Sequence, residues 1–445
     1  MRHIKVIGSF SIAMISVSAI LNLRGLPMMA ALGWQAIFFY ALACLCFLIP
    51  SAMVCAELAT HYPKNGGIYT WTREALGSRA GILVIWMEWV NNIIGFPATL
   101  STIVLTLSYV GFPALMLNKT LIFAAILLIL WASILYNLLG IRASSRLNVI
   151  GALLGTILPG LFIIGLGIVG MVHHGFPHLQ NTSFLPGLNI HHLAIFVGVL
   201  SAYSGMQVTA FHAENVKNPK TAYPRGLYVA AFIVFVLTSL GVMSIFSVVP
   251  MDHINLINGV MQAFSAFFTE FHMLWFIPVL ALLIAFGGIS SLSAWLVGPA
   301  RGLREMLHEH KMYPSITLLN KGEMPTAILL IEGIVGTALA SSFMWMPTLQ
   351  SAFWLLVALT SQFTVLMYIF VFVSAIKLRG AKCGILFSLL SILAIIASAI
   401  AFLFGLFPLQ SLSPHYTLHY VFMLLAGDFI ILILPFALFK KLRQH

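Results

Sequence analysis

ISVSAILNLRGLP (residues 15–27) and SAYSGMQVTAFH (residues 201–212) each place small polar residues, glycine or proline in the middle of an apolar run. A helix broken inside a bilayer leaves backbone N–H and C=O groups unpaired, so a break is tolerated only where protein, water or a ligand satisfies them. The two stretches occupy the same place in two consecutive blocks of five apolar segments. Such a pair is typical of an inverted-repeat membrane transporter with a binding site near the midplane. A kink that serves helix packing is the alternative interpretation of each break.

The composition excludes a water-soluble fold. Of 445 residues, 61% are hydrophobic and 7% are charged, whereas about a quarter of the residues in a soluble domain are charged. Apolar runs long enough to cross a hydrocarbon core of about 30 Å recur along the chain, without the alternation of outer-membrane barrels. We therefore predict an all-α integral membrane protein with 12 transmembrane helices. The predicted spans are residues 7–31, 34–59, 81–110, 119–139, 147–172, 191–212, 225–249, 273–299, 325–346, 351–376, 383–406 and 418–439.

The distribution of basic residues explains the net charge of +11. Of the 22 lysines and arginines, 20 fall in the N-terminus, the even-numbered loops or the C-terminus. Lys119 lies on the other side, and Arg24 lies within the first span. The positive-inside rule then predicts an even number of spans with both termini in the cytoplasm, in the inner (cytoplasmic) membrane. The charge reflects topology, so the lipid bilayer is an expected partner and nucleic acid is not.

We predict one transporter domain over residues 1–445. It comprises a first five-helix repeat (7–172), a second five-helix repeat (191–376), and two peripheral helices with a short tail (383–445). The cytoplasmic insert at residues 301–324 has apolar residues on one helical face, which predicts a short amphipathic helix along the membrane surface. A homodimer is one assembly that we consider.

Histidines collect in the loops on the predicted external side. They suggest either ordinary polar loop residues or a metal-binding or proton-sensing surface. The four cysteines fall within predicted spans, which favours free thiols over disulfides or a metal site. No cofactor and no metal ion are expected.

The breaks suggest which solute would bind. Freed N–H groups at the start of a half-helix attract a carboxylate, and freed carbonyls at the end of one attract an ammonium group. An amino acid presents both. Polar residues of the breaks and of the spans that face them are therefore the candidate ligands. The predicted substrate-binding residues are Ser16, Ser18, Ala19, Asn22, Arg24, Asn91, Asn92, Tyr203, Ser204, Gly205, Gln207, Ser291, Ser361, Thr364 and Tyr368, and the predicted gating residues are Arg24 and Trp295.

Arg24 is the charged residue nearest the first break. A guanidinium within the membrane costs at least about 2.5 kcal/mol on insertion scales, so it needs water, a partner or a substrate. Three roles remain open for Arg24: it binds a carboxylate, closes an outer gate, or extends towards the interface. For Asn91 and Asn92, hydrogen bonding between helices is the alternative to substrate binding.

Several motifs, taken in order, resemble the amino acid, polyamine and organocation (APC) transporter superfamily, and most closely its glutamate/GABA antiporter branch. They are AELATHYPKNGGIYTW (56–71), ENVKNPKTAYPRG (214–226), INLINGVMQAF (254–264) and AWLVGPARGL (294–303). The resemblance covers nearly the whole chain. It implies a five-plus-five inverted-repeat core in which spans 1 and 6 move against the rest.

The chain departs from that branch at four positions. Gln207 and Ser291 stand where the branch usually carries acidic residues, Arg24 stands where an aromatic residue is expected, and Thr364 replaces a tyrosine. Specificity for glutamate or GABA therefore does not follow from the resemblance. Motifs of nucleotide-binding proteins and of membrane-embedded hydrolases are missing from the sequence, which argues against an enzyme or an ATP-driven pump.

The sequence predicts a secondary active transporter, either an antiporter or a cation-coupled symporter, that moves amino acids or close derivatives by alternating access. Two alternatives remain: an amino acid sensor that has lost transport, and a polyamine or organocation carrier with the same fold.

Overall fold

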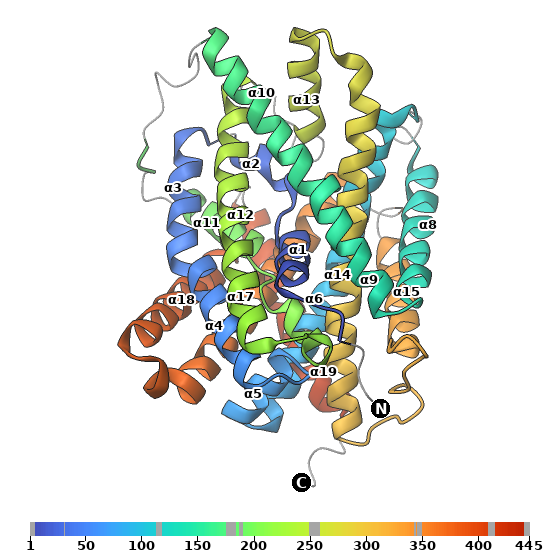
Figure 1. Cartoon of the computed structure of the whole chain (residues 1–445), viewed down its shortest axis with the longest axis vertical. Coiled ribbons are helices and arrows are strands. Elements are labelled where there is room, and N and C mark those ends of the chain that lie inside the picture. The colour runs from blue at the N-terminus through green and yellow to red at the C-terminus, as the bar shows by residue number, and fades with distance from the viewer. Residues whose placement is uncertain are drawn as a thin grey trace.

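A computed structural model describes residues 5–30, 32–112, 118–174, 184–186, 190–248, 259–341, 344, 349–407 and 414–439. Within these residues the chain is a bundle of helices, most of them running along the long axis of the molecule (Figure 1). The helices of the first half are α1 (Ser9–Ile20), η1 (Leu23–Gly25), α2 (Leu26–Ala30), α3 (Trp34–Ala43), η2 (Cys44–Leu48), α4 (Ile49–His61), α5 (Ile68–Leu76), α6 (Ser78–Leu107), η3 (Ser108–Val110), α8 (Lys119–Asn137), α9 (Ile141–Ile150), η4 (Gly151–Ile157) and α10 (Leu158–His174). Those of the second half are α11 (Ile190–Ala202), η5 (Val208–Asn215), α12 (Pro219–Val248), α13 (Gly259–Glu270), η7 (Leu274–Phe276), α14 (Ile277–Glu309), α15 (Thr326–Ala340), α17 (Leu349–Cys383), α18 (Ile385–Phe404) and α19 (Pro414–Leu438).

Nine helices of the described residues are long and apolar enough to cross a membrane. They match nine of the twelve predicted spans, and α1 and α15 are shorter apolar helices at the predicted first and ninth spans. The all-helical membrane class is thereby confirmed, while the count of twelve spans stays a prediction. The prediction that the first and sixth segments are interrupted agrees with the structure.

The first break lies between α1 and α2. Helix α1 ends at Ile20, Leu21 and Asn22 are not helical, and a single 3₁₀ turn (η1) precedes α2. The second break follows α11, where residues 203–207 leave the helix before the 3₁₀ segment η5 begins. Helix α1 packs against α12 and α14 in the middle of the bundle, so both breaks lie deep in the molecule.

Two long apolar helices contain a π-helical segment. Residues 44–48 (η2) join α3 to α4, and residues 151–157 (η4) join α9 to α10. A π-helical turn adds a residue to the helical register and is often found beside functional sites. In η4, Gly155 lets the helix approach α14 so closely that an added Cβ would lie 2.2 Å from the backbone nitrogen of Gly287.

The prediction of a separate amphipathic helix at residues 301–324 is wrong. Helix α14 continues through Pro299 and ends at Glu309, a length of about 50 Å at 1.5 Å per residue. Its apolar face in this region is buried in the protein, because Leu303, Met306 and Leu307 are all at most 5% exposed. The helical periodicity of this segment is therefore correct, but its apolar face packs against the helix bundle and not against the membrane surface.

Two short helices were not predicted, α5 and α13. They lie at opposite ends of the bundle in Figure 1. Helix α5 lies in the second loop, which the basic residues assign to the cytoplasm, and α13 lies in the seventh loop, which they assign to the outside. We refer to the α5 end as the predicted cytoplasmic end.

Candidate functional site

A cavity of about 50 Å³ lies beside the first break. The chain of the break borders it at Leu21, Asn22 and Leu23, and α6, η4, α13 and α14 supply the rest of its wall. A space of this size holds water-sized groups, since one water needs roughly 10–15 Å³ by a comparable measure. Of the predicted ligands, Asn22 and Ser291 line it.

Hydroxyl groups make up most of the polar lining of this cavity. Thr99, Thr102 and Thr106 on α6 recur at helical spacing and so share one face, and Thr156 of η4 joins them. None of the residues that line the cavity is charged. These threonines were missed by the sequence analysis, although their spacing within a long apolar helix was a readable signal.

Trp295 of α14 connects the two breaks. Its indole Nε1 donates a hydrogen bond to the carbonyl of Ala19 at 3.0 Å. A Cβ added to Gly205 in the second break would lie 3.4 Å from the same ring. Asn92 of α6 donates to the carbonyl of Trp295 at 2.5 Å and holds that turn of α14 in place. The predicted gating residue thus lies between the two interrupted helices.

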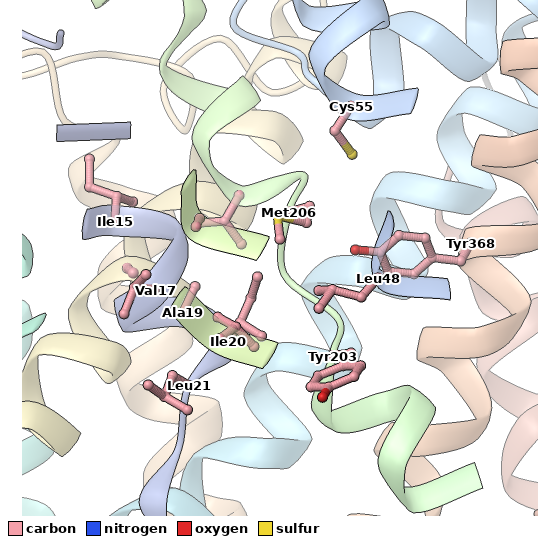
Figure 2. Packing of buried hydrophobic residues seen from close by; sticks show 14 of the residues in the cluster. Ile15, Val17, Ala19, Ile20, Leu21, Leu48, Cys55, Tyr203, Met206 and Tyr368 are labelled. Carbon is pink, nitrogen blue, oxygen red and sulfur yellow. The ribbon is translucent and has the colours of Figure 1, made fainter. Parts of the chain in front are cut away.

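A chain of hydrogen bonds runs from the second break into the core. The backbone N–H of Gly205 donates to Tyr368 Oη at 3.0 Å, and Tyr368 Oη donates to Gln207 Oε1 at 2.5 Å. Gln207 Nε2 in turn donates to Glu88 Oε1 at 2.8 Å. Gln207, Glu88 and Tyr368 are each at most 1% exposed. Figure 2 shows Tyr368 pointing from α17 towards the chain that carries Met206.

The structure therefore brings together three of the predicted ligands, Gly205, Gln207 and Tyr368. Glu88 was not among the predicted ligands, and its place in this chain of bonds was not foreseen. The available signal was an acidic residue in the interior of an apolar helix, which is rare and usually functional.

Other predicted ligands brace neighbouring helices. Asn91 donates to Thr364 Oγ1 at 3.2 Å and joins α6 to α17. Ser18 and Ser290 are 2.7 Å apart and join α1 to α14. For these residues the structure supports interhelical bonding, which was the stated alternative for Asn91.

Two predicted ligands, Tyr203 and Ser204, make their hydrogen bonds outside the cavity and outside the hydrogen-bond chain. The hydroxyl of Tyr203 lies 3.0 Å from Thr238 Oγ1 on α12, and the ring packs against Tyr40. Ser204 donates to the carbonyl of Ser201 in its own chain segment. The half-buried Ser361 lies on α17, and Ser16 is buried in α1 with no hydrogen-bond partner for its hydroxyl. Arg24 belongs to the η1 turn, but its side chain lies outside what the structure describes.

A second polar cluster lies towards the predicted cytoplasmic end. Arg301 is 4% exposed, and its guanidinium donates to His212 Nδ1 at 2.8 Å and to Asn215 Oδ1 at 2.9 Å. Asn215 donates to Glu323 Oε2 at 2.9 Å, and its carbonyl accepts from the backbone N–H of Ile7 at 3.1 Å. Helix α14, the segment after the second break and the chain that precedes α1 are thus tied together.

His310 directly follows the last residue of α14, Glu309. Its Nε2 is 3.1 Å from Ser78 Oγ. Burial, together with the nearby Arg73 guanidinium, lowers the pKa of His310. The neutral imidazole is therefore favoured, and its ring can accept a hydrogen bond from the serine.

Among the described residues, no group of three or more His, Cys, Asp or Glu side chains is placed to hold a metal ion. Of the external histidines, only His272 has a described side chain, so their proposed role lies outside the described residues. All four cysteines are free.

Comparison with known proteins supports the family resemblance seen in the sequence motifs. A family model described as amino acid permease matches residues 7–431. An uncharacterized transporter of Legionella pneumophila is 37% identical over 98% of this chain and 97% of its own length. The glutamate/gamma-aminobutyrate antiporter of Lactococcus lactis is 30% identical over 75% of this chain and 68% of its own length.

A crystal structure of MhsT in complex with L-phenylalanine shares the fold, with a TM-score of 0.64 at 14% identity. The match covers 91% of this chain and 100% of that one.

Proposed function

Because the chain belongs to the amino acid permease family, we propose that it carries small neutral amino acids or close derivatives across the cytoplasmic membrane by alternating access. The family makes it a membrane transporter of amino acids or their derivatives rather than an enzyme. We also propose that transport occurs by exchange or by cation-coupled uptake, and that the two broken helices move during transport.

The observation that carries the proposal is the position of Trp295 between the two breaks. The Trp295 indole bonds to the end of α1, and a side-chain carbon at Gly205 would meet the same ring, so movement at one break would alter the packing at the other. Backbone groups freed at such breaks suit the carboxylate and the ammonium group of an amino acid.

The uncharged lining of the cavity supports a neutral substrate. A second carboxylate or a second ammonium group buried there would lack a charged partner among the lining residues, and a buried charge without a partner is strongly disfavoured. The hydroxyls of Thr99, Thr102 and Ser291 suit a small or polar side chain. A dicarboxylate or a polyamine fits this lining less well.

The proposed architecture follows the sequence prediction. Residues 7–172 and 191–376 form two five-helix repeats, and α18 and α19 lie outside them. Both termini are placed in the cytoplasm by the basic loops.

Counterflow in proteoliposomes tests the proposal. Vesicles are loaded with one unlabelled compound and mixed with the same labelled compound, for each amino acid, GABA, agmatine and putrescine. We expect transient accumulation of small neutral amino acids. Binding in a thermal-shift assay without counterflow would indicate a sensor, and counterflow of putrescine alone would indicate an amine carrier.

A further inference from the structure

Glu88 is a buried carboxyl with an incomplete set of partners. It lies in the middle of α6 and is 1% exposed. Its Oε1 accepts the hydrogen bond from Gln207, but its Oε2 is buried and has no hydrogen-bond partner. A buried charged group is normally paired or fully hydrogen-bonded. One oxygen of Glu88 meets neither condition.

The groups that face Glu88 come from three other elements. Gln207 contacts it from the second break, and the ionisable side chains near it are Cys55 of α4 and Tyr368 of α17. In the described part of the chain, no lysine, arginine or histidine forms an ion pair with this carboxyl. A site built in this way holds a neutral acid without penalty and an anion only through its hydrogen bonds.

The amide of Gln207 gives the site two consistent arrangements. In the structure its Nε2 donates to Glu88, and its Oε1 accepts from Tyr368. If Glu88 carries a proton and the amide turns over, the carboxylic O–H donates to Oε1, and Nε2 donates to Tyr368 Oη. Both arrangements keep a hydrogen bond at each end of the amide, one at Oε1 and one at Nε2.

The two arrangements differ in what Tyr368 can do. When Glu88 is ionised, Tyr368 donates its hydroxyl proton to Gln207, and the hydroxyl oxygen accepts from the N–H of Gly205. With the protonated acid, the hydroxyl oxygen accepts from the amide, and its proton is free to turn towards a substrate or a carbonyl of the break. Gly205 and Gln207 both belong to the break, so movement there changes the bonds that Glu88 receives.

We propose that Glu88 is the proton-binding residue of transport, and that the Gln207 amide passes its protonation state to Tyr368 and the second break. The proposal rests on the proposed transport function and deepens it. Proton binding at Glu88 and the conformation of the break are coupled, and the coupling is reciprocal. Of the two hydrogen-bonded side chains, Glu88 and Gln207, only Glu88 has a carboxyl group that can bind a proton.

The test measures two fluxes in the same proteoliposomes. Uptake of labelled L-alanine, L-glutamate or GABA is recorded together with the internal pH, reported by a trapped fluorescent dye. For the wild type we expect a fixed number of protons for each amino acid moved. In Glu88→Gln the proton flux for each amino acid should fall to zero. Glu332→Gln is the matched control, because Glu332 is an equally buried carboxyl on α15 outside this chain of bonds, and it should keep the wild-type ratio.

A swap of the pair separates proton binding from packing. Glu88→Gln combined with Gln207→Glu retains one carboxyl and one amide, so at least half of the wild-type proton ratio should return. A Glu88→Gln variant that keeps the wild-type ratio overturns the proposal.

A measurement on the unmodified protein guards against misfolded variants. Binding of the transported amino acid is measured by calorimetry in two buffers of different ionisation enthalpy at several pH values. Proton uptake or release on binding supports the proposal, and its absence throughout contradicts it. Amino acid flux without proton flux removes this proposal alone, whereas no flux of any compound in the counterflow screen removes the proposed function as well.

Discussion

The indole Nε1 of Trp295 donates to the carbonyl of Ala19 at 3.0 Å, at a point where α1 is about to leave the helical path. Figure 2 shows Ala19 and Ile20 close to the chain of the second break, which carries Tyr203 and Met206. One hydrogen bond therefore joins α14 to the place where the two interrupted helices meet.

Replacing Trp295 with phenylalanine keeps an aromatic ring but removes this donor. The carbonyl of Ala19 then lacks its partner, at a cost of about 1–3 kcal/mol, and we expect counterflow to fall roughly tenfold. Trp86→Phe is the control, because Trp86 Nε1 makes an equivalent bond to the carbonyl of Ile431, away from the breaks. It should reduce thermal stability but leave counterflow per folded molecule near the wild-type rate. Equal effects of the two substitutions on counterflow would contradict a gating role.

The approach of η4 to α14 depends on two glycines that also line the cavity. A Cβ at Gly155 would lie 2.2 Å from Gly287 N, and one at Gly287 would lie 2.4 Å from Gly155 O. Gly155→Ala should therefore destabilise the protein by about 1–3 kcal/mol, seen as a lower melting temperature in detergent. Gly165→Ala in α10 meets no atom within 4 Å, and it should be neutral or slightly stabilising. The prediction fails if Gly155→Ala melts at the wild-type temperature.

We expect Arg301 to hold the predicted cytoplasmic end closed, because its bonds to His212 and Asn215 tie α14 to the segment after the second break. Arg301→Gln removes the buried cation and weakens the bonds to these partners, at a cost of about 1–3 kcal/mol for each group left unsatisfied. We expect Cys55, which is fully buried on α4, to react several-fold faster with a membrane-impermeant maleimide in inside-out vesicles, as read by mass spectrometry.

The control for this change is Arg304→Gln, one turn along the same helix. Arg304 is partly exposed and bonds to Glu305 and to the carbonyl of Thr317. Its replacement should leave Cys55 labelling unchanged. Equal labelling of the Arg301 variant and the wild type would show that this cluster does not close the molecule.

The sequence predicts carboxylate binding as one of three roles for Arg24, and a substitution tests this role directly. If its guanidinium binds the substrate carboxylate, Arg24→Ala abolishes uptake of every carboxylate-bearing substrate, and Arg24→Lys keeps a part of it because the charge remains. Initial rates over a range of substrate concentrations check this. Normal uptake by Arg24→Ala would exclude the carboxylate-binding role of this arginine.

The features that sequence analysis predicted are carried by local signals. A glycine or proline inside an apolar run marks a break, and the side on which lysines gather marks topology, so neither requires knowledge of contacts. The motifs in order also indicated the family, which the comparisons confirm.

The features that it missed depend on partners far apart in the chain. The predicted eighth span ends at residue 299 and leaves Arg301 in a loop. The partner that holds Arg301 inside the bundle, His212, lies 89 positions away in the chain. Glu88 meets Gln207 across 119 positions, and Gln207 meets Tyr368 across 161. Such pairs are set by how helices pack, which the pattern of one helix does not contain.

Counterflow by Gly205→Ala tests most directly the central claim that transport uses the two breaks. Gly205 has φ +128°, which residues with a side chain rarely adopt, and an added Cβ would lie 2.8 Å from Ile20 Cγ1 and 3.5 Å from Ala19 Cβ, at the end of α1. We predict that folded Gly205→Ala protein loses at least about 90% of counterflow, since a strained backbone and a blocked contact cost several kcal/mol together. Gly165→Ala, measured alongside, should exchange at the wild-type rate. Wild-type counterflow by folded Gly205→Ala protein would contradict the account.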